Sequence, residues 1–160
     1  MSELVSTGVD GLDAILNGGI TKHSTVLVSG NPGTGKSIFG IQYLHAGATE
    51  HDERGVYVSF EEDAADIEAA AASVGLDEFS DLVEAGEIVI HDKREMLREE
   101  DFSEAVDKLL ETVADGSFDR LVLDSLSMFQ LFFEDEREQR TSLLKFSDIL
   151  KSNGLTSLLI

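Results

Sequence analysis

The stretch from residue 30 to residue 37 constrains this chain more than any other feature of its sequence. It matches the pattern G-x-x-x-x-G-K-[ST] in full, with the residues Gly30, Asn31, Pro32, Gly33, Thr34, Gly35, Lys36 and Ser37. An apolar, strand-like run precedes it and a helix-like segment follows. Glycines let a backbone curl around phosphate oxygens, and a helix N-terminus adds a favourable dipole. The pattern therefore predicts a phosphate-binding loop between a strand and a helix.

Two residues at the end of this loop carry most of the expected chemistry. Lys36 is expected to bridge the β- and γ-phosphates of ATP, and Ser37 to ligate Mg²⁺. Pro32 is the only proline in the chain, and its fixed φ is expected to stiffen the loop. The alternative is an ordinary glycine-rich turn, but a chance match to the full pattern is roughly a one-percent event in a chain of this length. We therefore expect ATP and Mg²⁺ as ligands.

A second candidate site is the apolar run 120–124, which ends in Asp124. In an open α/β sheet, ligands gather at the carboxyl ends of the strands, so Asp124 is expected beside the phosphate loop. There it would hold Mg²⁺, directly or through water. The alternative is a solvated turn residue. The presence of the phosphate loop favours the metal role.

A third candidate site is the pair Glu61 and Glu62, which directly follows a strand-like run. A carboxylate at this place can orient and deprotonate the water that attacks the γ-phosphate. The alternative is a plain helix N-terminus, where acidic residues are also favoured. The residues by themselves leave these two interpretations open.

Strand-like and helix-like segments alternate along the whole chain. Strands are expected at 25–29, 55–60, 87–90, 120–124 and 155–160, and helices at 37–45, 63–74, 77–84, from 103 onward and at 136–153. The last helix is expected to turn Leu143, Leu144, Phe146, Ile149 and Leu150 to one side. This order predicts an α/β fold, a mainly parallel sheet with helices on both faces. With no linker or repeat, residues 1–160 are expected to form one domain.

The composition is strongly acidic. The chain has 32 Asp and Glu against 12 Lys and Arg, a formal charge of −20. The acidic residues are spread along the chain, which favours adaptation to a salty cytoplasm over an acidic tail for a basic partner. The same charge argues against loose DNA binding, which needs Lys and Arg. There is no cysteine and no apolar run long enough for a membrane span, so we expect a cytoplasmic protein.

Several motifs occur in one order along the chain: Thr-Gly-Val-Asp-Gly-Leu-Asp at 7–13, Asn-Gly-Gly-Ile at 17–20, the phosphate loop, Val-Tyr-Val-Ser-Phe-Glu-Glu at 56–62 and Leu-Asp-Ser-Leu-Ser at 123–127. In this the chain resembles the KaiC-like branch of the RecA/RadA ATPase superfamily, found widely in archaea. The resemblance implies a RecA-like P-loop NTPase core. It also implies ATP and Mg²⁺ contacts for Lys36 and Ser37, a Walker B role for Asp124, and catalytic roles for Glu61 and Glu62.

The resemblance also bears on assembly and activity. Such proteins commonly form hexameric rings or filaments with ATP at the subunit junctions, so a homo-oligomer is expected. Family members continue beyond the position that matches Ile160, so we expect a C-terminally truncated domain. Such a domain is expected to bind ATP but to hydrolyse it weakly or not at all. The leading expectation is a regulatory ATPase, with a regulatory protein as a further partner. The alternatives are a RadA-type DNA recombination mediator and a non-hydrolysing signalling module.

Overall fold

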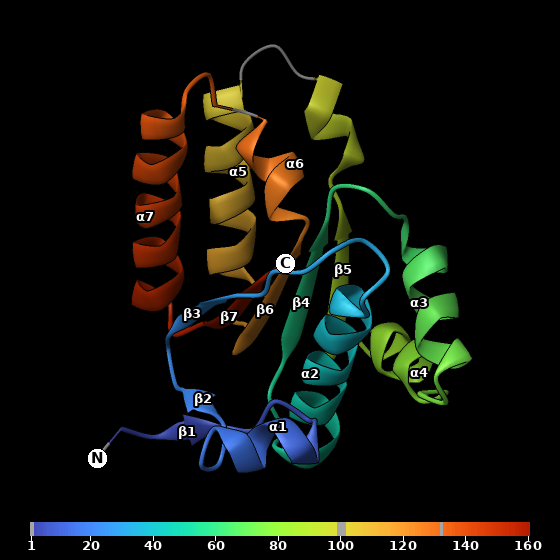
Figure 1. Ribbon diagram of the computed structural model, residues 1–160. Helices are drawn as coiled ribbons and strands as arrows, with labels where there is room; N and C mark the ends of the chain where they lie inside the picture. The colour runs from blue at the N-terminus through green and yellow to red at the C-terminus, as the bar shows by residue number, and fades with distance from the viewer. Residues whose placement is uncertain (1, 99–101, 132) are drawn as a thin grey trace.

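Five parallel strands form the central sheet, in the order β3-β7-β6-β4-β5 (Figure 1). The structure is a computed structural model that describes residues 2–98, 102–131 and 133–160. The strands of this sheet are β3 (Thr25–Leu27), β4 (Gly55–Ser59), β5 (Ile88–Asp92), β6 (Arg120–Asp124) and β7 (Thr156–Leu159). The expected parallel sheet and α/β class are confirmed. The first strand is shorter than its predicted range of 25–29.

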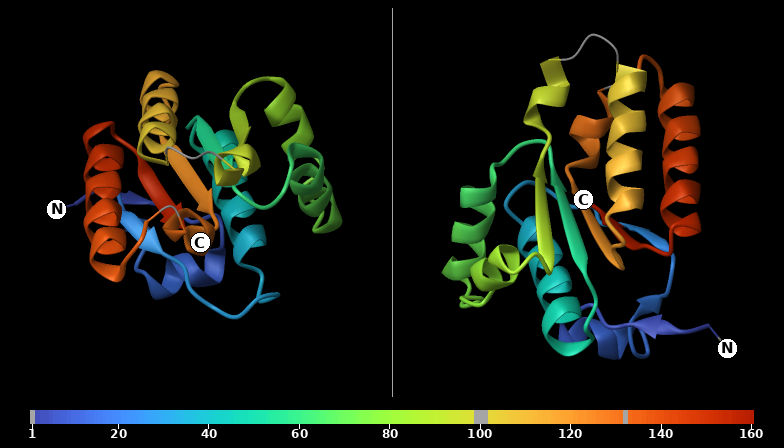
Figure 2. Two further views of the ribbon diagram at one scale, coloured as in Figure 1. Left: turned by 90° about the horizontal axis from the view of Figure 1, so that it is seen from above. Right: turned by 180° about the vertical axis from the view of Figure 1, so that it is seen from behind.

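Helices cover both faces of the sheet (Figure 2). One face carries α2 (Lys36–Glu50), α3 (Ala64–Ser73) and α4 (Phe79–Glu84), and the other carries α5 (Phe102–Asp115), α6 (Leu126–Gln130) and α7 (Glu136–Ser152). A 3₁₀ turn, η1 (Arg94–Arg98), follows β5. Helix α2 runs further than the predicted range of 37–45. Within the described residues, no helix is long and apolar enough to cross a membrane.

Each face of the sheet has its own apolar core. Strands β4 and β6 are buried at every position, as expected for central strands of a parallel sheet covered on both sides. The core under α2, α3 and α4 includes Tyr43, Leu44, Ile67, Phe79 and Val122. The core under α5, α6 and α7 includes Val58, Leu109, Leu121, Phe129 and Phe146. Burial of one such side chain contributes about 1.5–3 kcal/mol to the stability of the fold, so the two cores together stabilise the sheet.

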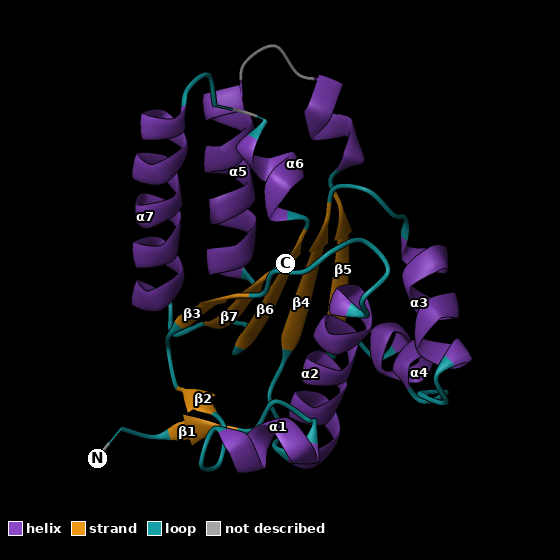
Figure 3. Cartoon of the chain, viewed as in Figure 1, coloured by secondary structure: helices purple, strands orange, loops and turns teal. Residues whose placement is uncertain are grey.

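The N-terminal segment forms a small separate sheet (Figure 3). Strands β1 (Leu4–Val5) and β2 (Ile20–Thr21) pair antiparallel, with α1 (Asp10–Ile15) between them. Asp13 accepts hydrogen bonds from the hydroxyls of Ser6 and Thr7 and from the Thr7 backbone N–H. Burial alone would raise the pKa of Asp13, but these hydrogen bonds lower it below its usual value. The carboxylate therefore ties the turn after β1 to α1 within the N-terminal segment.

A buried arginine joins this segment to the sheet. Arg120 on β6 is fully buried, and its guanidinium donates to the backbone carbonyls of Ser6 and Tyr43. It also forms an ion pair with Glu53 at 3.0 Å. A buried charge is tolerated when it is paired and hydrogen-bonded in this way. Arg120 thus links the N-terminal segment, α2 and the start of β4 at the edge of the sheet opposite the phosphate loop.

Candidate nucleotide-binding site

The predicted phosphate loop connects β3 to α2, as expected. Gly33 and Gly35 have φ angles of 80° and 92°, which lie in the left-handed region that favours glycine. Gly35 is the N-cap of α2, so the helix begins at Lys36. Residues 30–35 are exposed to solvent. The loop therefore presents its backbone at the N-terminus of a helix that begins beside the central sheet, an arrangement suited to an anion.

Short hydrogen bonds hold the loop in shape. The Lys36 Nζ donates to the backbone carbonyl of Gly30 at 2.7 Å. The Thr34 hydroxyl donates to the backbone carbonyl of Asn31 at 2.8 Å. The lysine ammonium thus lies against its own loop, where a phosphate oxygen can compete for it without a large movement of the chain.

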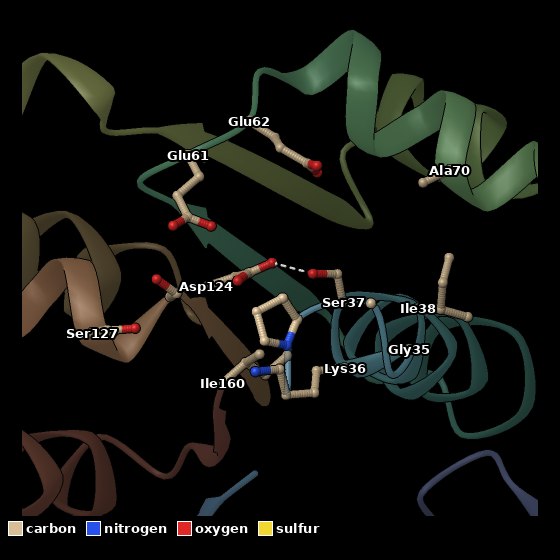
Figure 4. A pocket seen from close by; sticks show the side chains of 13 residues that line it. Gly35, Lys36, Ser37, Ile38, Glu61, Glu62, Ala70, Asp124, Ser127 and Ile160 are labelled. Atoms are coloured by element: carbon tan, nitrogen blue, oxygen red, sulfur yellow. Dashed lines mark hydrogen bonds between the residues drawn. The ribbon is translucent and has the colours of Figure 1, made fainter. Parts of the chain in front are cut away.

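Asp124 lies beside the loop, where the sequence predicted it. It ends β6 and is 8% exposed, and the Ser37 hydroxyl donates to its Oδ2 at 2.6 Å (Figure 4). The Tyr57 hydroxyl donates to the same Oδ2 at 2.5 Å. Burial, together with the charge of Asp124, raises the pKa of Tyr57, so this hydroxyl stays protonated and remains a donor. The sequence did not identify Tyr57, because it lies within an apolar strand.

Glu61 and Glu62 follow β4 and are both exposed. The Ser59 hydroxyl donates to the carbonyl of Glu62 at 2.7 Å and accepts from its N–H at 3.0 Å, which fixes the Glu62 backbone. Partial burial, followed by the nearby charge of Asp124, raises the pKa of Glu62 above its usual value. A carboxylate with a raised pKa is a stronger base than an ordinary one.

These groups line one cavity of about 590 Å³ (Figure 4). Its described lining includes Lys36, Ser37, Glu61, Glu62 and Asp124, so the structure brings the three predicted sites together. Of the other loop residues, Pro32, Gly33 and Gly35 line the cavity, whereas Gly30, Asn31 and Thr34 do not. The lining residues to which the sequence assigned no role are Ile38, Ala70, Ser125, Ser127 and Ile160. Among the described lining residues Lys36 is the single cation.

The oxygen ligands here suit a magnesium ion. Mg²⁺ prefers oxygen and is usually held by one or two carboxylates or hydroxyls together with substrate phosphates. Ser37 and Asp124 provide a hydroxyl and a carboxylate in direct contact. Within the described residues, no cluster of three or more His, Cys, Asp or Glu side chains is placed to hold a metal. The pair therefore fits a metal ion whose other ligands come from a bound phosphate.

The parallel sheet, the loop before α2 and the helices on both faces define a RecA-like α/β fold. Three comparisons agree with this class. The family described as "ATPase: KaiC" matches residues 5–160. The crystal structure of a KaiC-like protein from Pyrococcus horikoshii superposes with a TM-score of 0.83 at 35% identity, over 99% of this chain and 71% of that one. The chain therefore belongs to the KaiC family of ATPases.

The matching relatives include proteins of two kinds. A UPF0273 protein of Aeropyrum pernix is 34% identical over 172 residues, covering 100% of this chain and 68% of its own length. The circadian clock oscillator protein KaiC of Prochlorococcus marinus is 29% identical over 161 residues, covering 97% of this chain. The chain spans 31% of that KaiC protein, about a third of its length.

Proposed function

We propose that this chain is the nucleotide-binding unit of a KaiC-like regulatory ATPase, which binds ATP with Mg²⁺ and hydrolyses it. One observation carries the proposal: the phosphate loop, the Ser37–Asp124 pair and two glutamates line a single cavity. We propose that residues 1–160 act as one domain in the cytoplasm. The net charge of −20 argues against a DNA partner, whose phosphates would need Lys and Arg.

The loop residues would bind the phosphates. Backbone N–H groups from Gly33 to Ser37 would surround the β-phosphate, and Lys36 would exchange its bond to Gly30 for a phosphate oxygen. Ser37 and Asp124 would hold Mg²⁺. A bound Mg²⁺ would offset the negative charge of the phosphate oxygens. These contacts come from the loop and from the end of β6.

Glu62 is the better candidate for the general base. Its backbone is held by Ser59 and the pKa of its carboxyl group is raised, both of which favour proton transfer from water. Glu61 lines the same cavity and would orient the same water. In the proposed hydrolysis, water would attack the γ-phosphorus and Glu62 would take one proton from that water. ADP would leave with the electrons of the broken P–O bond.

Turnover by a single chain is proposed to be slow. Lys36 is the one cation among the described lining residues, which also include the carboxylates of Glu61, Glu62 and Asp124. An additional cation on the transferring phosphoryl group is worth roughly 10³–10⁵ in rate in related enzymes. We propose that a neighbouring subunit of a homo-oligomer, a hexamer or a filament, supplies that cation. Assembly would then control hydrolysis, and a regulatory protein could act on it.

Thermal melting and phosphate release test this function together. A ligand at about 100 times its Kd adds about 2.7 kcal/mol, which for this size raises Tm by about 5–10 °C. We expect this increase with Mg-ATP, together with phosphate release per chain that rises with protein concentration. The absence of any Mg-ATP effect on Tm would contradict the binding proposal. Fast, concentration-independent release would contradict the need for a neighbour.

A further inference from the structure

Tyr57 occupies an unusual place beside the candidate metal site. It lies on β4, is fully buried and does not belong to the described lining of the cavity. Its hydroxyl nevertheless reaches Asp124 Oδ2 at 2.5 Å. In the β4–β6 register, Tyr57 pairs with Val122 and Ser59 pairs with Asp124, so this contact runs diagonally on one face of the sheet. Tyr57 therefore reaches Asp124 from within the protein core rather than from the cavity.

The contact matters because Asp124 is a nearly buried carboxylate. A carboxylate in such a place needs hydrogen bonds or an opposite charge. Within the described residues, Asp124 forms no ion pair, and its side-chain donors are the Ser37 and Tyr57 hydroxyls. Both donate to Oδ2, so together they fix the rotation of the carboxylate group. The Ser37 hydroxyl belongs to the loop and would itself be a metal ligand, whereas Tyr57 belongs to the rigid sheet.

We propose that Tyr57 is a positioning residue that holds Asp124 in the orientation needed to bind Mg²⁺ with the nucleotide. This inference rests on the proposed function. Groups that hydrogen-bond to metal ligands typically contribute 10- to 100-fold in metal affinity. Tyr57 would act through Asp124, since it does not itself line the cavity.

The chain provides its own matched control, because it has two tyrosines, Tyr43 and Tyr57. Tyr43 is also fully buried, but its hydroxyl donates to the backbone carbonyl of Thr156, away from the cavity. Replacement of either tyrosine by phenylalanine removes one buried hydroxyl and its hydrogen bond. Loss of stability should therefore be similar in the two variants, and any difference in magnesium dependence belongs to Tyr57.

The measurement is the ratio of the ADP dissociation constants in excess EDTA and in excess Mg²⁺, determined by calorimetry. Tyr57→Phe should lower this ratio by about 10- to 100-fold and leave binding in EDTA nearly unchanged. Tyr43→Phe should keep the parent's ratio. In an Asp124→Asn background, Tyr57→Phe should have no further effect, because its role passes through that carboxylate.

Tyrosine fluorescence gives a second readout that does not depend on the Tyr57→Phe variant. The chain has no tryptophan, so Tyr57 is the sole tyrosine of Tyr43→Phe. Addition of Mg²⁺ to the ADP-bound Tyr43→Phe chain should change the Tyr57 emission, since its carboxylate acceptor gains a cation. Unchanged emission in a chain with magnesium-dependent binding would overturn the inference.

The outcomes separate this inference from the proposed function. A parent chain that binds no nucleotide would overturn both. A parent whose ADP affinity does not depend on Mg²⁺ would overturn the role of Tyr57 but leave nucleotide binding intact. A magnesium-dependent parent whose ratio survives in a folded Tyr57→Phe variant would overturn the inference alone.

Discussion

Glu61 and Glu62 are adjacent in the sequence, but their surroundings differ. Glu62 is tied through its backbone to Ser59, and the pKa of its carboxyl group is raised by partial burial and by the charge of Asp124. Neither effect could be read from the sequence, because both depend on how the chain turns after β4 and on how close β6 comes to it. The sequence predicted the pair as a site, and the structure distinguishes its two members.

We predict that Glu62→Gln retains Mg-ATP binding and loses most of its turnover. The change is nearly isosteric and removes only the base, which typically contributes 10²–10⁴ in rate. Phosphate release should therefore fall by about 100-fold or more, while the Kd from calorimetry stays within about threefold of the parent value. Glu61→Gln is the companion variant and should have the smaller effect. Parent-like turnover in the double variant would remove both residues from the mechanism.

The pH dependence of turnover follows from the same carboxylate. Glu62 works as a base only when deprotonated, and its pKa is raised. Activity should therefore fall as the pH decreases through a value above the usual range of a glutamate, and be fully present at higher pH. A pH–rate profile in constant salt measures this decrease of turnover at acidic pH. The decrease should be absent from the residual activity of Glu62→Gln. An unchanged decrease in that variant would assign it to another group.

At the scale of single residues, the place of the loop between β3 and α2 was predictable and the contact of Tyr57 with Asp124 was not. Residues 30–37 form a local pattern, in which each glycine and the Lys-Ser pair have a role that depends on sequence neighbours alone. Tyr57 meets Asp124 across 67 positions of sequence. Such a contact depends on strand order and register, which the motifs at 56–62 and 123–127 do not specify.

At the scale of elements, the alternation of strand-like and helix-like segments predicted the central sheet and most helices around it. The elements that were missed are short: β1 and β2 have 2 residues each, α1 has 6, and η1 and α6 have 5 each. Segments of this length show no measurable period. The predicted apolar side of α7 was only partly right. Phe146 and Leu150 are buried, but Leu144 is 67% exposed and Ile149 is 37% exposed, because the helix contacts the sheet through a narrower stripe.

The close approach of α2 to the sheet depends on a glycine. A Cβ at Gly47 would lie 2.6 Å from the Cδ and Nε of Arg120, the buried arginine that joins the N-terminal segment to the sheet. We predict that Gly47→Ala lowers the free energy of unfolding by about 2 kcal/mol or more, through overpacking and displacement of that arginine. For a chain of this size, Tm should fall by about 4–8 °C.

Gly11→Ala is the matched control for this prediction. Gly11 lies in α1, where an added Cβ would meet no heavy atom within 4 Å. Alanine is favoured over glycine in a helix, so the Tm of this variant should be unchanged or slightly higher. Equal melting of the Gly47→Ala variant and the parent, measured by circular dichroism, would show that Arg120 does not limit the position of α2.

At the scale of the whole molecule, the net charge of −20 is the dominant feature. We predict that the protein loses stability when salt is diluted. The Debye length rises from about 3 Å at 1 M salt to about 10 Å at 0.1 M, so repulsion among the dispersed carboxylates grows. Tm measured in a potassium chloride series should decrease toward low salt. Sucrose at matched osmolality controls for solvent exclusion, and a Tm that is flat or higher at low salt would contradict adaptation to a salty cytoplasm.

Calorimetric titration of Mg-ATP into the parent chain and into Lys36→Ala tests the central claim most directly. The parent should bind one nucleotide per chain. Removal of the Lys36 ammonium, which contacts the loop at Gly30, should weaken binding by about 100-fold. Lys151→Ala, at the far end of α7, is the charge-matched control and should bind like the parent. Lys36→Ala binding Mg-ATP as tightly as the parent would show that the nucleotide site is not at this loop.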